Sequence, residues 1–195
     1  MINAIIDLTN KKGRDIMKKV LMLLLVGVLV LSLAACTKKE EEKKSGNNGG
    51  TTVQDLIELS KKVHANVENI PFVEEMEIDI HEPNELKMVT GLSSSEYVLH
   101  AIRTEAMIGA QAYSFVLVRV VEDADIEAMK KEMLDNIDLG KWICAWADKV
   151  HVTNFGNIIM LVMGDKEISY IDEVYAEFEK ASNNSLGKKL TRLAG

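Results

Sequence analysis

An uninterrupted apolar stretch near the amino terminus constrains this chain more than any other feature of its sequence. Two lysines precede sixteen mostly apolar residues, 20–35, which end in two alanines. A basic segment, an apolar segment and small residues before a cleavage point are the three parts of a secretory signal peptide. The sequence therefore predicts that residues 1–35 are removed and take no part in the fold.

The residue that follows the two alanines is a cysteine, Cys36. The order Leu33, Ala34, Ala35, Cys36 resembles the lipobox of bacterial lipoproteins. In that family a diacylglyceryl group is attached to the cysteine sulfur, and the chain is then cut just before this cysteine, here between Ala35 and Cys36. Two acyl chains give stable membrane anchoring, whereas one gives only marginal binding. The resemblance implies a protein held on the outer face of the cell membrane by the lipid on Cys36.

An uncleaved transmembrane helix is the alternative interpretation of the same stretch. Spanning the hydrocarbon core takes at least about 17 apolar residues, and residues 20–35 number sixteen before Lys38 and Lys39 follow. A cleaved signal is therefore favoured. Residues 1–16 would make the segment before the apolar stretch unusually long for a signal peptide, and Asp7 and Asp15 would give it mixed charge. We therefore hypothesise that Met17 is the true start.

Three further segments follow the predicted signal peptide. Residues 36–50 contain the lipidated cysteine and a linker of mixed charges, serine, glycine and asparagine. Such a segment buries too little apolar surface to offset the entropy of ordering, so it is predicted to be flexible. Residues 51–182 have the length of a single domain. The basic residues 183–195 are predicted to form a loose tail.

Charge argues against binding to nucleic acid. Without residues 1–35 the chain keeps 18 Lys and Arg against 28 Asp and Glu, a formal net charge of −10. An acidic domain repels nucleic acid phosphates and anionic lipid head groups. The predicted partners are therefore the membrane, reached through the lipid on Cys36, and an unknown protein of the cell envelope.

The carboxyl-terminal half gives the clearest fold signals. Residues 113–121 are β-branched and aromatic with few polar interruptions, as in a strand covered on both faces. A helix capped by Asp123 or Asp125 and ended by Gly140 is predicted next, then a hairpin over 149–163 that turns at Gly156, and a helix capped by Asp165. This strand–helix–strand–strand–helix pattern predicts an α+β fold, a two-layer sandwich in which a small, mainly antiparallel sheet packs against helices.

The amino-terminal half is harder to interpret. A helix is predicted over 52–69, with Thr52 and Asp55 in a capping box. Alternating residues within 71–83 predict a half-buried edge strand, with an extended loop as the alternative. Two short helices are expected next, one over 85–90 that stops at Gly91 and one over 97–102 that is capped by the serines before it.

Motifs with a known chemical role are missing from the sequence. There is no phosphate-binding glycine loop, no His-Glu-x-x-His, no Cys-x-x-Cys and no nucleophile elbow. The four histidines are scattered without metal-ligand spacing, and the acids within 74–82 alternate along a strand instead of converging on calcium. We therefore predict a non-catalytic protein with no metal and no cofactor. A hydrolytic enzyme that pairs the serines 93–95 or Cys144 with His81, His100 or His151 is a less favoured alternative.

Two tryptophans and a free cysteine form the most distinctive local pattern. Trp142 and Trp146 are four residues apart and would lie on the same side of a helical turn. Packing in a core or interface is the simplest interpretation, and an aromatic ligand-binding platform is the alternative. Cys144 lies between them and is predicted to be buried, because free cysteines are among the most buried residues. A reactive or metal-binding thiol and an intermolecular disulfide remain open.

Three segments carry a wider resemblance, namely residues 112–119, 141–144 and 161–163. They are similar to a group of uncharacterised lipoproteins of Gram-positive, clostridia-like bacteria. The resemblance implies fold and location but no activity. The expected function is therefore a non-catalytic binding or accessory domain, and the alternative is a small-ligand receptor that uses Trp142 and Trp146.

Overall fold

The computed structural model describes residues 51–68, 70–108, 110–165 and 170–194. This part of the chain contains both helices and strands. The helices are α2 (Val53–His64), α3 (Pro83–Thr90), α4 (Ile126–Asn136) and α5 (Tyr170–Ala181). The strands are β1 (Val73–Glu77), β2 (Val98–Ala106), β3 (Tyr113–Val120), β4 (Lys149–Phe155), β5 (Ile158–Gly164) and β6 (Leu190–Leu193).

The six strands form one antiparallel sheet in the order β1-β2-β3-β5-β4-β6. The predicted central strand is confirmed, because every residue of β3 except Arg119 is buried. The predicted hairpin is confirmed as well, since Phe155 pairs with Ile158 across the turn and Gly156 has a φ of 53°. A positive φ is readily accessible to glycine. The predicted edge position of β1 is also confirmed.

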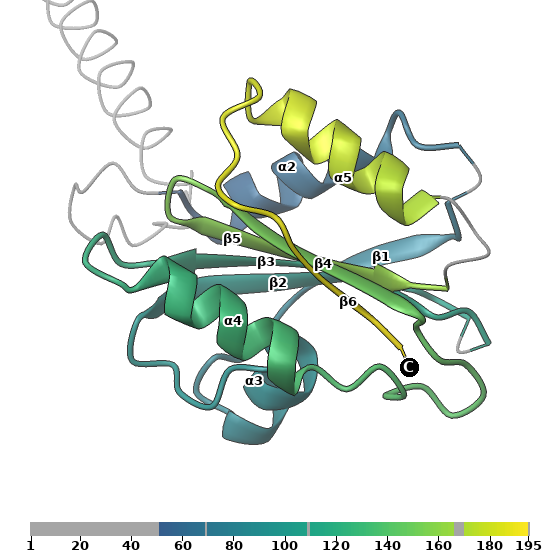
Figure 1. The fold of residues 1–195 in the computed structure, drawn as a ribbon, viewed down its shortest axis with the longest axis horizontal. Helices are drawn as coiled ribbons and strands as arrows, with labels where there is room; N and C mark the ends of the chain where they lie inside the picture. Colours follow the sequence, from purple (N-terminus) through teal and green to yellow (C-terminus); the bar gives the residue numbers. More distant parts are fainter. Residues whose placement is uncertain (1–50, 69, 109, 166–169, 195) are drawn as a thin grey trace, which may run out of the picture. The chain divides into compact units, whose positions relative to one another are not determined.

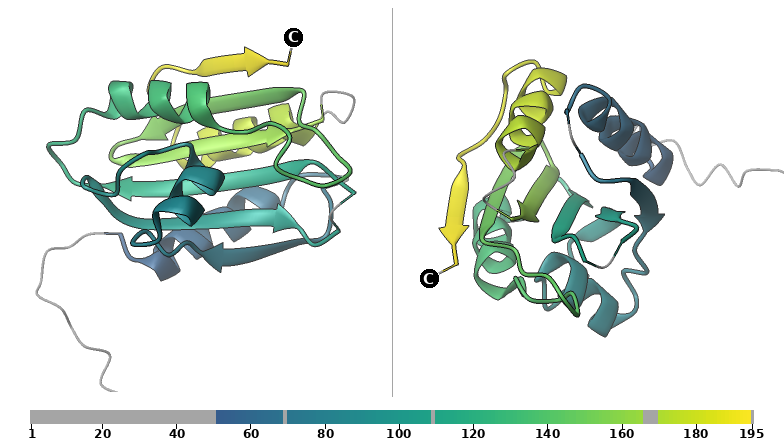
Figure 2. Two further views of the ribbon diagram at one scale, coloured as in Figure 1. Left: turned by 90° about the horizontal axis from the view of Figure 1, so that it is seen from below. Right: turned by 90° about the vertical axis from the view of Figure 1, so that its right-hand side faces the viewer.

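Helices cover both faces of this sheet, as Figures 1 and 2 show. α2 and α5 lie on one face, and α3 and α4 lie on the other. The predicted α+β class, with an antiparallel sheet packed against helices, is confirmed. The sheet has a helix layer on each side because the central strands β3 and β5 are apolar on both faces, and each face needs its own cover.

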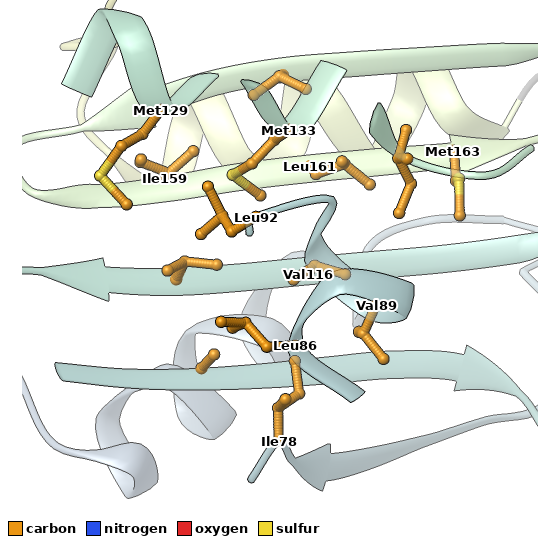
Figure 3. Packing of buried hydrophobic residues seen from close by; sticks show 14 of the residues in the cluster. Ile78, Leu86, Val89, Leu92, Val116, Met129, Met133, Ile159, Leu161 and Met163 are labelled. Atoms are coloured by element: carbon orange, nitrogen blue, oxygen red, sulfur yellow. The ribbon is translucent and has the colours of Figure 1, made fainter. Parts of the chain in front are cut away.

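The two faces carry separate hydrophobic cores. Side chains alternate along β3, so that Phe115 belongs to the α2/α5 core and Val116 belongs to the α3/α4 core. In the α3/α4 core, Met129 and Met133 of α4 point toward the strand residues Ile159 and Leu161 (Figure 3). The helices are therefore held by burial of one apolar face each.

Local sequence signals explain most of the helix ends. Thr52 caps α2 in a capping box with Asp55, Asp125 caps α4, and Gly91 ends α3 with a φ of 80°. These predictions are confirmed. Two predicted ends are wrong, since α2 stops at His64 and α4 stops four residues before Gly140.

Two predictions of larger segments are also wrong. Residues 97–102, predicted as a helix, belong largely to β2, and the predicted loose tail contains the edge strand β6. Basic residues of the tail make fixed contacts, because the Arg192 guanidinium donates to the carbonyl oxygens of Asp135 (2.8 Å) and Ile137 (2.5 Å) at the end of α4. The fully buried Lys130 also donates to the Lys188 carbonyl at 3.0 Å. The contacts of Arg192 have a general cause, because unpaired carbonyls at a helix carboxyl terminus attract cations.

The remaining predictions concern the two ends of the chain. Asn183 and Asn184 both adopt positive φ, 55° and 57°, and end α5 as predicted. The cap predicted at Asp165 precedes residues 166–169, which lie outside the described residues, as do Cys36, Met17 and the signal and linker segments. None of the helices in the described ranges is long and apolar enough to cross a membrane.

Candidate functional site

The loop between α4 and β4 carries both predicted site tryptophans, and we call residues 138–148 the tryptophan loop. It is not helical, so Trp142 and Trp146 do not share a helix face as predicted. Trp142 is half-buried against the α3/α4 core, whereas Trp146 is 65% exposed. The Ala147 amide donates to the Leu139 carbonyl at 2.8 Å and closes the loop. Trp146 lies over Gly140, where an added Cβ would meet the indole at 2.8 Å.

The prediction that Cys144 is buried is wrong, because its side chain is exposed and forms no disulfide. The tryptophan loop divides its apolar residues between two directions. Trp142, Ala145 and Ala147 pack against the core, whereas Ile143 is 94% exposed and Cys144 lies beside it. The path of the loop turns Trp142 and Ala147 inward and leaves Cys144 on its outer side.

Beneath the tryptophan loop lies a largely buried polar group of four residues, Arg103, Glu105, Ser114 and Lys141, which we call the Glu105 cluster. The strand register places Glu105 of β2 directly opposite Ser114 of β3. Glu105 Oε1 accepts hydrogen bonds from Lys141 Nζ at 2.5 Å and from Ser114 Oγ at 3.0 Å. Lys141 Nζ also donates to Ser114 Oγ at 3.1 Å. The Lys141 side chain therefore fastens the loop to the sheet.

The Glu105 cluster crowds two cations around one carboxylate. The side chains of Lys141 and Glu105 keep only 7% and 15% of their exposure, and Arg103 keeps 23%. Burial lowers the pKa of Lys141, Glu105 opposes this shift, and Arg103 adds to it by repulsion. A buried charge is stable only when it is paired. Lys141 forms the closer ion pair with Glu105, at 2.5 Å, whereas Arg103 lies 3.7 Å from the same carboxylate.

Exposed apolar side chains lie at the same end of the sheet as this cluster, and we call them the apolar rim: Phe72, Met107, Ile108, Ile143 and Trp146. Their exposed fractions are 75%, 55%, 59%, 94% and 65%. Antiparallel pairing brings the start of β1, the end of β2 and the start of β4 to one end of the sheet, and the Met107 amide donates to the Phe72 carbonyl at 2.9 Å. An apolar group of this kind is typical of a contact surface.

The apolar rim lies at the end of the domain away from the point where the chain enters it. α2 starts after its cap Thr52 and runs toward His64, whose imidazole reaches Tyr113 at the rim end of β3. At 1.5 Å per residue a helix of this length spans about 18 Å. Figure 1 shows α2 beginning at the left, whereas the loop between β2 and β3 and the loop before β4 lie at the right.

The residues of the hydrolase alternative are not assembled. His151 Nδ1 lies 2.8 Å from Thr191 Oγ1 and its Nε2 lies 3.0 Å from Asp172 Oδ1, while Ser93 donates to Glu132. His81 and His100 line an open hollow of about 490 Å³ at the edge of the sheet. Among the described residues, no hydrogen bond joins these histidines to the serines 93–95 or to Cys144.

Metal ligands do not converge either, within the ranges that the structure describes. No group of three or more His, Cys, Asp or Glu side chains in these ranges is placed to hold an ion. The acids of the 74–82 segment follow a strand and a turn at the sheet edge. The calcium alternative therefore has no support in this geometry.

His64 forms a buried network that sequence patterns did not predict. Its Nδ1 lies 2.7 Å from the Ser60 carbonyl and its Nε2 lies 2.6 Å from the Tyr113 hydroxyl. A carbonyl only accepts, so Nδ1 carries the proton and Nε2 accepts from Tyr113. Burial lowers the pKa of His64, and the hydrogen bond to the Ser60 carbonyl and the charge of Glu75 only partly oppose this shift. The same network includes Ser60 and Thr104, whose hydroxyls are 2.7 Å apart, and it joins α2 to the sheet.

This network predicts a domain that loses stability in mild acid. Folding lowers the pKa of His64, so the unfolded chain binds more protons than the folded chain below about pH 6.5. The free energy of unfolding therefore falls as the pH drops through that range. Each unit of lowered pKa corresponds to about 1.4 kcal/mol. Burial lowers the pKa of His151 too, which adds in the same direction. We expect urea unfolding to give a lower free energy at pH 5 than at pH 7, and a flatter pH dependence in His64→Asn. An equal pH dependence in this variant would contradict the assignment to His64.

Comparisons with known proteins gave no match. No family model, no curated protein and no solved structure matches the chain. The proposals that follow therefore rest on the sequence and on the contacts described above.

Proposed function

We propose that this protein is a lipoprotein held on the outer face of the cell membrane by a diacylglyceryl group on Cys36. The signal-like segment, the small residues before Cys36 and the polar linker after it support this location. The lipid supplies two acyl chains, so the domain itself needs no further membrane-binding surface.

The domain in this proposal is a non-catalytic binding module that contacts another protein of the cell envelope through its apolar rim. The observation that carries the proposal is the gathering of five exposed apolar side chains, among them Trp146 and Ile143, at the end away from the chain entry. Aromatic residues and methionine are enriched in protein interfaces, and buried aromatic anchors supply much of their binding energy. The composition of residues 37–50 predicts a random coil that reaches roughly 20 Å on average, and such a linker would leave the rim free to meet a neighbouring protein.

A non-catalytic role agrees with how the reactive side chains are used. His64 and His151 are held in internal hydrogen bonds on both ring nitrogens, and Lys141 is engaged by Glu105. These groups fasten helices, loops and strands to one another. The thiol of Cys144 is exposed and has no histidine bonded to it among the described residues.

Site-specific photo-cross-linking in lipidated cells tests the contact. A photoreactive amino acid at position 143 should give a discrete cross-linked protein, because Ile143 is the most exposed residue of the rim. The same group at Asp123, exposed in the turn before α4 at the other end of the sheet, is the matched control and should give none. Adding Met107→Glu should lower the yield at position 143 at least fivefold, since a charge at the rim opposes desolvation.

Two outcomes would contradict the proposal. Equal yields at positions 143 and 123 would mean that the rim has no special partner. Cross-links from position 143 to lipid alone would mean that the apolar rim meets the membrane rather than a protein.

A further inference from the structure

Arg103 is the charged group of this site whose bonding capacity is least used. Its Nε is buried and has no hydrogen-bond partner. Its two terminal nitrogens have only weak contacts, one with Glu105 Oε2 at 3.7 Å and the other with the Met76 sulfur at 3.8 Å. A guanidinium carries five N–H donors in a planar fork. A half-buried arginine with so few acceptors therefore keeps N–H groups that can donate to a further acceptor.

The charges around Arg103 do not supply that acceptor. Glu105 is the nearest carboxylate, and its Oε1 already accepts from Lys141 and Ser114. Glu74 is the register partner of Glu105 but is exposed, and no ion pair joins it to Arg103 in the described part of the chain. Asp138 is exposed as well and accepts from the Gly140 amide. The half-buried side chains alone thus carry two positive charges and one negative charge.

The surroundings of Arg103 combine this charge with apolar surface. Met76 and Arg103 are neighbours in the register of β1 and β2, and the tryptophan loop is fastened to the same face by Lys141. Strand alternation continues to Phe72 and Met107, which places these rim residues on the face that carries Glu105. None of the helices in the described part of the chain covers the rim ends of β1 and β2 on this face, as the left view of Figure 2 shows.

We propose that Arg103 anchors a carboxylate that is attached to an apolar or aromatic group, and that this group lies against the apolar rim. Arginine matches a carboxylate with two parallel N–H···O bonds, which are stronger than bonds between neutral groups. The ligand is therefore an apolar acid, either a free small molecule or a peptide that ends in an apolar residue with a free carboxyl terminus. This inference rests on the proposed binding function and names the chemistry that it recognises.

A titration followed by NMR tests the inference on the mature, lipidated chain in nanodiscs. The chain has two tryptophans, so Trp142 and Trp146 give two indole N–H signals, and the Arg103 Nε–H gives a third reporter. Indole-3-acetate should shift all three, whereas the neutral indole-3-acetamide should bind at least tenfold more weakly. A short peptide that ends in Leu-Trp, compared with its amidated form, decides whether the acid is a small molecule or a chain end.

Arg103→Gln should reduce the affinity for indole-3-acetate at least tenfold. The matched control is Arg119→Gln. Arg119 is also half-buried and its Nε also has no partner, but it lies on β3 in register with Ile158, which belongs to the α2/α5 core. This control should change the affinity less than twofold. If Arg103→Gln does not fold, the Arg103 Nε–H shift in the unmodified chain, compared between acid and amide, decides the question.

Equal binding of acid and amide, or equal effects of the two arginine substitutions, would overturn the role of Arg103. Cross-linking at position 143 would be unaffected by that result, so failure of the anchor is distinguishable from failure of the apolar rim as a contact surface.

Discussion

On the proposed anchor, replacing Cys36 by serine should abolish lipid attachment completely, so that the chain carries neither of the two acyl chains. Palmitate enters a lipoprotein through the diacylglyceryl group on the cysteine sulfur, and a serine offers no thiol for that transfer. Each buried CH₂ contributes about 0.8 kcal/mol to membrane binding, so loss of two acyl chains removes nearly all of the anchoring energy. A formal net charge of −10 for the mature chain gives no compensating attraction to anionic lipids.

Radiolabelled palmitate and cell fractionation measure this effect. The Cys36→Ser chain should take up no label and keep residues before position 36. The serine-containing chain 36–195, secreted behind a signal that is cleaved without lipid, should be recovered in the medium. Cys144→Ser is the matched control, because Cys144 is the only other cysteine and is exposed, and it should label like the unmodified chain. Label in Cys36→Ser, or its loss in Cys144→Ser, would refute the anchor.

The elements that could be predicted from the sequence are those whose signals are local. β3 is a run of β-branched and aromatic residues, the β4–β5 hairpin turns at Gly156, and α3 ends at Gly91. In each of them a few neighbouring residues decide the backbone conformation. The pattern of apolar faces then gave the α+β class, because buried strands and one-sided helices have few ways to pack.

β2 could not be predicted because its polar residues are satisfied by partners far away in the sequence. Glu105 is paired with Lys141, and Thr104 with Ser60 of α2. Read alone, a strand with histidine, arginine and glutamate lacks the alternation that identifies a half-buried strand. The serines before it resemble a helix cap, which led to the wrong assignment. β6 was missed for a similar reason, since Arg192 bonds to carbonyls of α4.

The residues of the candidate site also differ in whether the sequence alone could identify them. Trp142 and Trp146 were identifiable because aromatic residues at close spacing stand out in any sequence. Arg103, Glu105 and Ser114 were not, because only the register of β2 and β3 and the path of the tryptophan loop bring them together. Met107 and Phe72 became part of the site for the same reason. Exposure of Cys144 depends on the loop conformation, which residue statistics do not encode.

The largest loss of folding stability is expected from Gly91→Ala. Gly91 is buried at the end of α3 with a φ of 80°, and a Cβ there would lie 2.8 Å from the Met133 carbonyl oxygen and 3.0 Å from the Ile137 nitrogen. Left-handed backbone costs a residue with a Cβ about 1–2 kcal/mol. Overpacking against rigid backbone adds about 1–3 kcal/mol. The sum, about 2–5 kcal/mol, is a large part of a typical domain's stability of about 5–15 kcal/mol.

Gly156→Ala separates these two contributions, because Gly156 has a φ of 53° but no atom within 4 Å of its added Cβ. This control should therefore show only the backbone cost of about 1–2 kcal/mol. Urea unfolding of both variants in the Cys36→Ser chain 36–195 gives the two free energies of unfolding. A loss for Gly91→Ala no larger than that for Gly156→Ala would mean that α4 moves away easily. The close approach of α3 to α4, which closes the α3/α4 core beside the tryptophan loop, would then contribute little to the fold.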